Sequence, residues 1–143
     1  MIKVLVQSSV LFAATLSVTG GSREILKLGK EKVLKVYTSQ DIIDEVREHI
    51  EGKYPEFTGA LERILDSYNL RILRSFSDRA LAQFKDGYVS DPDDIHVIAA
   101  AKKVKVDYLI TLDKKHFLNN AQLPQKVGIS IVSPGVFLQE ILC

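Results

Sequence analysis

The stretch DPDDIHVIAAAKKVKVDYLITLD, residues 91–113, decides the fold class of this chain. It opens with Asp91 and Pro92, which are typical of a helix start because Asp caps a helix and Pro fits its first position. An apolar helix and a short apolar strand follow, and the segment ends at Asp113. Burying a carboxylate costs free energy unless it is paired, hydrogen-bonded or bound to a metal. The pattern therefore predicts a buried α/β unit whose acidic ends carry chemistry.

Short apolar strands alternate with helices through the rest of the chain as well. The expected strands cover residues 3–6, 33–37, 108–112 and 129–132, with a short apolar piece at 70–73. The expected helices follow caps at Ser8 or Ser9, at Ser22, at Thr38 or Ser39 and at Asp91, with others at 56–68 and 77–86 and a closing helix from Pro134. This alternation favours a three-layer α/β/α sandwich around a mostly parallel sheet, in one domain covering residues 1–143.

The composition excludes several function classes. A formal net charge of +1 gives no overall attraction for a polyanion, so contact with nucleic acid has to come from a local patch. The one cysteine, Cys143, rules out an internal disulfide and a zinc site built on thiolates. No apolar run approaches the roughly 20 residues that span a membrane. We therefore expect a cytoplasmic protein with no membrane contact.

Three acids are expected at the edge of the sheet where the parallel strands end. Asp113 follows the strand at 108–112, and open parallel sheets bind ligands at this edge. Glu45 borders the apolar stripe of its helix, and Asp94 opens the most apolar helix of the chain. Carboxylates from separate elements repel one another unless a hard cation lies between them, which favours Mg²⁺ or Mn²⁺. Such an ion can activate water against a phosphodiester.

Other polar residues are expected to support this site. Gln7 ends the first strand, where a matching acid is expected, and Thr111 lies two residues before Asp113 on the same face of its strand. Asp91 is assigned mainly to capping its helix. Asp93, like Asp91, is close enough in sequence to compensate in part for a missing acid.

Basic and aromatic residues give weaker signals. Lys114 and Lys115 directly follow the last of the three acids and are the best candidates for contacting RNA phosphates. His49 and His96 are expected to be structural, and for His116 a solvated turn and a phosphate contact are equally favoured. The five tyrosines show no spacing typical of a base-stacking platform.

The order of these segments resembles PIN domains, the nuclease fold of VapC-type toxins and related ribonucleases. The resemblance covers nearly the full chain and rests on VLVQSSVL (residues 4–11), TSQDIIDEV (38–46), DPDD (91–94), AAA (99–101), VDYLITLD (106–113) and IVSP (131–134). Each segment alone is a weak signal, whereas their order and spacing together are specific. The resemblance implies an endoribonuclease that depends on Mg²⁺ or Mn²⁺ and cleaves single-stranded RNA.

By position, the resemblance assigns Glu45, Asp94 and Asp113 to three of the four catalytic, metal-binding acids of the family. The fourth, normally an Asp that ends the first strand, is Gln7 here. A carboxamide keeps an oxygen but loses the charge, so metal affinity is expected to drop and a two-metal arrangement is disfavoured. Ser9 matches a polar position that supports the first Asp in the family.

Three functional hypotheses follow. The first is the metal-dependent ribonuclease, as the toxin of a toxin–antitoxin pair, with an antitoxin protein as partner and a homodimer as the expected assembly. The second is a degenerate PIN domain that binds RNA or protein without cleaving it, and Gln7 is its motivation. The third is an aspartyl-phosphate receiver, which is disfavoured because the first strand ends without an acidic pair.

Overall fold

The structure is a computed structural model that describes residues 1–85 and 87–142. Its centre is a five-stranded sheet in which every pair of neighbours is parallel, in the order β3-β2-β1-β4-β5. The strands are β1 (Ile2–Val6), β2 (Leu34–Ser39), β3 (Arg71–Leu73), β4 (Tyr108–Ile110) and β5 (Ser130–Val132). The predicted parallel α/β architecture is thereby confirmed.

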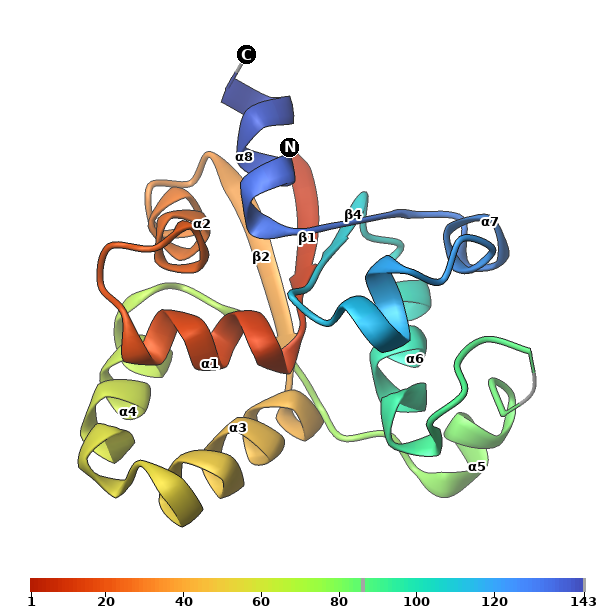
Figure 1. Ribbon diagram of the computed structural model, residues 1–143, viewed down its shortest axis with the longest axis horizontal. Helices are drawn as coiled ribbons and strands as arrows, with labels where there is room; N and C mark the ends of the chain where they lie inside the picture. The colour runs from red at the N-terminus through yellow and green to blue at the C-terminus, as the bar shows by residue number, and fades with distance from the viewer. Residues whose placement is uncertain (86, 143) are drawn as a thin grey trace.

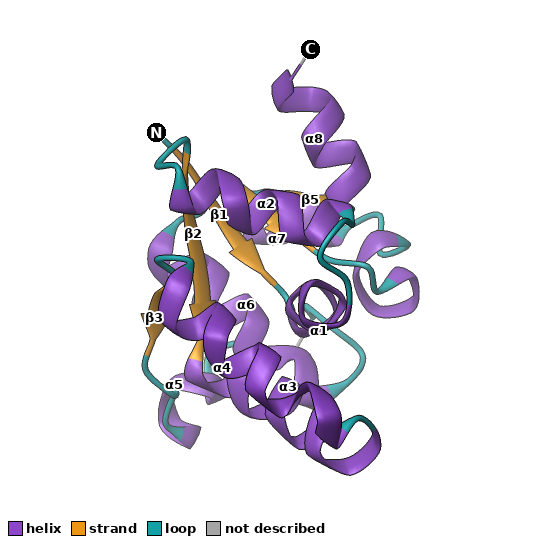
Figure 2. Ribbon diagram, turned by 90° about the vertical axis from the view of Figure 1, so that its left-hand side faces the viewer, coloured by secondary structure: helices purple, strands orange, loops and turns teal. Residues whose placement is uncertain are grey.

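Helices cover both faces of the sheet (Figure 1). One face carries α1 (Ser8–Leu16), α2 (Gly21–Lys30), α3 (Gln40–Lys53) and α4 (Thr58–Ser67), which stand in front of the sheet in Figure 2. The other face carries α5 (Asp78–Ala82), α6 (Ile95–Val104) and α7 (Leu123–Val127). The closing helix α8 (Pro134–Leu142) contacts α2 and extends beyond the sheet at the end where the N-terminus lies. Among the described residues, every helix is too short or too polar to cross a membrane.

The central strands are buried on both faces, as their uninterrupted apolar runs predict. Val4 and Val6 in β1 and Leu109 in β4 are 0% exposed. Helix α6 is apolar almost all round because it also packs in the interior. Its buried residues are Ile95, Val97, Ile98, Ala99, Ala100 and Ala101. Burial of this continuous core supplies the main favourable free energy of folding.

Two helix starts differ from those expected. The cap of α1 is Gln7, whose side chain accepts from the N–H of Ser9, rather than Ser8 or Ser9 themselves. Helix α2 begins at Gly21, and the expected cap Ser22 is buried inside it. A capping residue has an extended backbone, and the chain is extended one residue before each helix rather than at these serines. At α3 the expected alternative Ser39 is the cap.

The acidic segment before α6 also differs in detail. Asp91 caps a 3-10 turn, Pro92–Asp94, and accepts from the N–H of Asp93 at 2.9 Å, while α6 itself begins at Ile95. Helix α7 was not expected from the sequence. It has only five residues, too few to show an apolar period, and Pro124 near its start is not accompanied by a capping side chain.

Two glycines on neighbouring helices should respond oppositely to a methyl group. A Cβ on Gly29 in α2 would lie 2.6 Å from Cγ2 of Val36, a buried β-branched residue of β2 that cannot move aside cheaply. Gly29→Ala should therefore destabilise the fold by about 1–3 kcal/mol. Gly52 in α3 has nothing within 4 Å, so Gly52→Ala should stabilise it by about 0.5–1 kcal/mol. Urea unfolding of both variants checks the two signs, and a stabilised Gly29→Ala would contradict the close packing of α2 on β2.

Candidate active site

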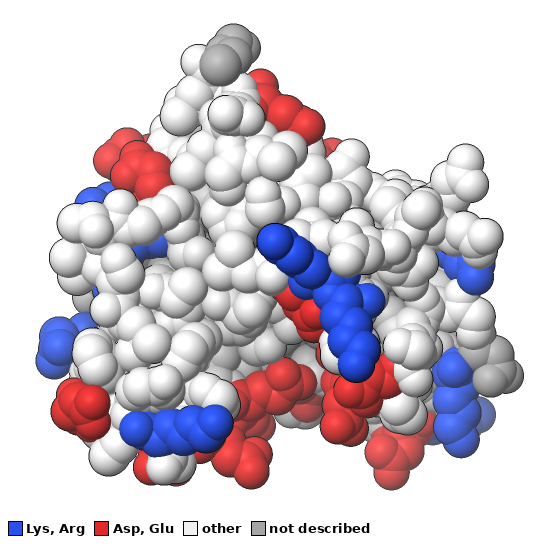
Figure 3. Space-filling model, viewed as in Figure 1, with Lys and Arg blue, Asp and Glu red and all other residues white. Residues whose placement is uncertain are grey.

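Polar side chains gather at the edge of the sheet where β1, β2 and β4 end. Gln7 directly follows β1, Asp113 lies three residues after β4, and Glu45 belongs to α3, which follows β2. These three residues line one open cleft of about 430 Å³, together with Ser8, Ser9, Phe12, Val46 and His49. Figure 3 shows Asp and Glu side chains gathered below the centre of the molecule, with Lys and Arg side chains crossing directly above them. The expected convergence of polar groups at this edge is therefore present.

The side-chain oxygen of Gln7 is held by three donors. It accepts from the N–H of Ser9 at 3.0 Å, from the Ser9 hydroxyl, and from the Thr111 hydroxyl at 3.0 Å. The Ser9 hydroxyl accepts from the N–H of Leu112 at 2.9 Å, and the Thr111 hydroxyl accepts from the N–H of Asp113 at 3.0 Å. Because each hydroxyl already accepts from a backbone N–H, its own proton is left to donate to Gln7.

This network fixes the orientation of the Gln7 amide. The backbone N–H of Ser9 can only donate, so the atom that it contacts is the amide oxygen. The amide nitrogen therefore points the other way and donates to the hydroxyl of Ser8 at 2.9 Å. Three donors around one oxygen suit a carboxylate, and they hold a neutral amide here. The oxygen that Gln7 retains is thus occupied by the protein itself, which weakens the expectation that it ligates a cation.

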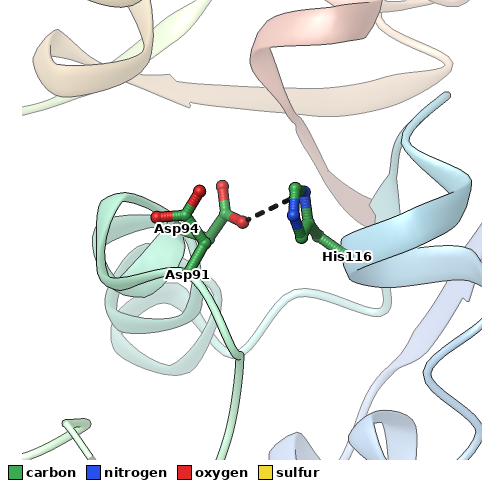
Figure 4. A group of neighbouring side chains, drawn as sticks. All are labelled: Asp91, Asp94 and His116. Atoms are coloured by element: carbon green, nitrogen blue, oxygen red, sulfur yellow. Dashed lines mark ion pairs between the residues drawn. The ribbon is translucent and has the colours of Figure 1, made fainter.

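Asp94 belongs to a close group with Asp91 and His116. Each of the three offers one ligand atom, and these atoms lie within 4.8 Å of one another. Figure 4 shows one ion pair in this group, between Asp94 and the imidazole of His116, which comes from the turn after β4. The Oδ2 atom of Asp94 is 3.6 Å from Nδ1 of His116, and it is buried without a hydrogen-bond partner among the described residues. A buried carboxylate oxygen in this condition suits a cation.

The electrostatic environment of Asp94 shows that the predicted acids lie near one another. Its pKa is raised to about 6, mainly because burial disfavours the charged form. The charge of His116 lowers this pKa, whereas the charges of Asp91, Asp113 and Glu45 raise it. Asp94 therefore connects the close group of Asp91 and His116 with the cleft that Glu45 and Asp113 line.

Two histidines contact the acids that the sequence singled out. Nε2 of His96 is hydrogen-bonded to Glu45. Nδ1 of His116 lies 3.0 Å from Oδ2 of Asp113, and the N–H of His116 donates to Oδ1 of the same carboxylate at 3.0 Å. Neither histidine was predicted to contact these acids from the sequence. His116 carries a sequence signal, because it follows Asp113 by three residues within one turn, but the pairing of His96 with Glu45 spans 51 residues.

These contacts also shift the histidine pKa values. The hydrogen bond to Asp113 raises the pKa of His116. Burial of the ring lowers the pKa of His96, but the hydrogen bond to Glu45 and the charges of nearby acids outweigh it, so the net shift is upward. Both imidazoles therefore favour the protonated form beside a carboxylate. A cation that binds here competes with these two protons.

Some of the oxygen atoms at this site are suitable ligands for a hard divalent cation. Asp94 supplies the buried oxygen without a partner, and Asp113 and Glu45 can exchange a histidine contact for an ion. Asp91 adds a nearby carboxylate, although it also caps the turn before α6. Gln7 offers no charge and no unoccupied oxygen. The described side chains could thus hold a cation, with fewer charges than four acids would give.

The remaining predicted residues lie at the margin of the site. Asp93 is exposed, and its N–H is bonded to Asp91. Lys114 and Lys115 are exposed on the π-helical turn Lys114–Leu118, which Asp113 caps. Their position beside the acids is compatible with phosphate contact.

Comparison with known proteins identifies the family. The sequence model of the PIN domain matches residues 3–115, so the chain belongs to the PIN domain family. No curated protein matches the chain.

Several solved structures share the fold. A chain of VapBC2 from Rickettsia felis, solved bound to a DNA fragment from its promoter, has a TM-score of 0.67 and 13% identity and covers 92% of this chain and 98% of its own. A chain of the DNA-bound VapBC of Salmonella typhimurium has a TM-score of 0.61 and 16% identity, and the match covers 94% of this chain and 99% of that one. VapC20 of Mycobacterium tuberculosis, described as a sarcin–ricin loop cleaving toxin, has a TM-score of 0.60 and 15% identity. The match covers 78% of this chain and 91% of that one. At these identities the likeness concerns the fold.

Proposed function

We propose that this PIN-domain protein is a divalent-cation-dependent endoribonuclease that cleaves single-stranded RNA and has a weakened metal site. The observation that carries the proposal is the buried Oδ2 of Asp94, which has no hydrogen-bond partner among the described residues and lies near His116 and other acids. A carboxyl group whose pKa is raised by burial and by neighbouring acids, as at Asp94, is characteristic of sites that bind cations or transfer protons. Family membership supports the same chemistry.

Each residue of the site has a distinct role in this proposal. Asp94, Asp113 and Glu45 hold Mg²⁺ or Mn²⁺, and the bound ion activates water and stabilises the charge of a phosphodiester under attack. Thr111 positions Asp113 through its backbone N–H. Lys114 and Lys115 attract RNA phosphates without reading sequence.

A second candidate function is supported by Gln7. Because its oxygen is occupied and its nitrogen donates to Ser8, this neutral side chain adds no negative charge to the site. The chain would then be a degenerate PIN domain that binds RNA or a protein without cleaving it. The two functions differ in one measurable property, which is cleavage in the presence of metal.

Incubation with a labelled single-stranded oligoribonucleotide distinguishes the two functions. With Mn²⁺ at millimolar concentration we expect cleavage products on a denaturing gel, and with excess EDTA we expect none. The high metal requirement follows from the missing charge at position 7. RNA that is bound but stays intact at every concentration of Mn²⁺ and Mg²⁺ would favour the binding module and contradict the nuclease.

The resemblance to VapC-type toxins extends the proposal to partners. We propose an antitoxin protein as the natural inhibitor and a homodimer as the assembly. Helix α8 supports the second point, because Val136 and Leu142 are 44% and 67% exposed while Phe137 on the same helix is buried. Sedimentation of the purified protein tests the assembly separately from activity.

A further inference from the structure

Three aromatic rings stand together beside the cleft that holds Glu45 and Asp113. Phe12 comes from α1, His49 from α3, and Tyr54 directly follows α3. The ring centroids of Phe12 and His49 are 4.7 Å apart, with their planes at 88°. The ring of Tyr54 lies 5.7 Å from that of Phe12 and 6.2 Å from that of His49.

These rings are accessible to a planar ligand. His49 is exposed, Tyr54 is 36% exposed and Phe12 is only partly buried. The interplanar angles of 88°, 55° and 37° show that no two of the three rings are stacked face to face. Since His49 and Tyr54 are also exposed, a further flat group can reach these rings from solvent.

Core packing explains only one of the three rings. Phe12 packs against the hydrophobic core, and its ring also lines the 430 Å³ cleft. His49 lines the same cleft, although it is exposed. The cleft thus joins an aromatic wall to the acids of the candidate active site.

The charges around this wall favour a neutral ligand group over a phosphate. His49 also lines a neighbouring hollow of about 350 Å³, whose other residues include Glu45, Glu48 and Lys53. Two carboxylates against one ammonium repel a phosphate at this position. The flat, uncharged part of a nucleotide is its base, and bases stack on aromatic side chains in single-stranded RNA complexes.

We propose that Phe12, His49 and Tyr54 form a stacking subsite for one unpaired nucleobase of an RNA strand. The inference rests on the proposed function, which makes single-stranded RNA the ligand. Stacking tolerates any base because every base has a π-face, so the subsite sets the position of the strand along the cleft rather than its sequence. A base held here places its backbone next to the acids that line the same cleft.

Nuclear magnetic resonance can locate the base directly. The chain has three histidines, so the ring signals of His49, His96 and His116 can be assigned individually. A six-nucleotide oligoadenylate is titrated in Ca²⁺, beside an oligomer of the same length with abasic riboses. We expect the His49 signals to shift with oligoadenylate and not with the abasic oligomer, which should bind at least about fivefold more weakly. Equal affinity for the two oligomers would overturn the proposal.

Substitutions separate stacking from general packing. Tyr54→Leu and His49→Leu keep apolar surface and lose the π-face, so each should weaken oligoadenylate binding about 5- to 150-fold. Tyr54→Phe keeps the ring and should bind like wild type. Wild-type affinity in both leucine variants contradicts the subsite, and circular dichroism of each variant confirms that it is folded.

Failure of the subsite and failure of the nuclease give different results. Cleavage in Mn²⁺ that proceeds with wild-type KM in both leucine variants refutes the subsite and leaves the nuclease intact. A protein whose His49 signals respond to oligoadenylate, but which never cleaves RNA, refutes the nuclease and retains the subsite.

Discussion

Gln7→Asp is expected to raise the affinity for Mn²⁺ about 10- to 100-fold and to increase RNA cleavage accordingly. The physical reason lies in the hydrogen bonds around position 7. Ser9 and Thr111 donate three hydrogen bonds to the side-chain oxygen, an arrangement that stabilises an ionised carboxylate. Asp is also a good N-cap, so α1 should tolerate the change. Isothermal titration with Mn²⁺ and a gel assay with single-stranded RNA measure the two effects.

Two further substitutions at position 7 separate charge from length. Gln7→Asn has the length of Asp without its charge, and Gln7→Glu has the length of Gln with a charge. If the charge at position 7 decides the affinity for Mn²⁺, Gln7→Asp should gain affinity while Gln7→Asn should not. Gln7→Glu shows whether an acid one methylene longer than Asp also raises this affinity. If Gln7→Asp binds Mn²⁺ no better than wild type, the missing acid is tolerated and the site is not weakened by Gln7.

Asp94→Asn is expected to lower the affinity for Mn²⁺ by at least about 100-fold and to abolish cleavage. Even neighbours of metal ligands change affinity about 10- to 100-fold, and Asp94 supplies the buried oxygen on which the proposed site depends. Asp93→Asn is a matched control, because Asp93 is adjacent in sequence but exposed. Equal loss in both variants would indicate a general charge effect rather than a ligand at Asp94.

The same variant tests the raised pKa of Asp94. Its pKa is about 6 in the fold against an ordinary value of 3.8, so its stabilising contribution is complete below pH 3.8 and is lost as the pH rises through about 6. A shift of this size corresponds to about 3 kcal/mol, and partial solvent contact reduces the expected loss to about 1–2 kcal/mol. Urea unfolding without metal should show wild type losing stability relative to Asp94→Asn across this pH range. Mn²⁺ favours the ionised carboxylate and should remove the difference.

Much of the fold could be predicted because its signals are local. The apolar runs at 3–6 and 108–112 indicate buried strands, although the second strand ends at Ile110 and Leu112 is exposed, and the Asp-Pro pair at 91–92 marks the start of the 3-10 turn before α6. Two predictions that failed, the absence of α7 and the cap of α1, also have local causes. Helix α7 is too short to show a period, and the cap of α1 depends on where the backbone is extended, which the residue types alone do not decide.

The site could be predicted only as far as each residue acts alone. Glu45 and Asp94 were found because each borders an apolar face of its own helix. The contact between His96 and Glu45, and the cluster of Tyr54 with Phe12, join separate segments, and no spacing within one segment encodes them. The side-chain oxygen of Gln7 is held by Ser9 and by Thr111, which are 102 residues apart in the sequence.

The hydrogen bonds around Gln7 also set when the site can exist during synthesis. They join residues 7–9 to residues 111–113, so the polar network is incomplete until the end of β4 has left the ribosome. All of the elements from α1 to α6 are therefore synthesised before Thr111 can hold the side chain of Gln7.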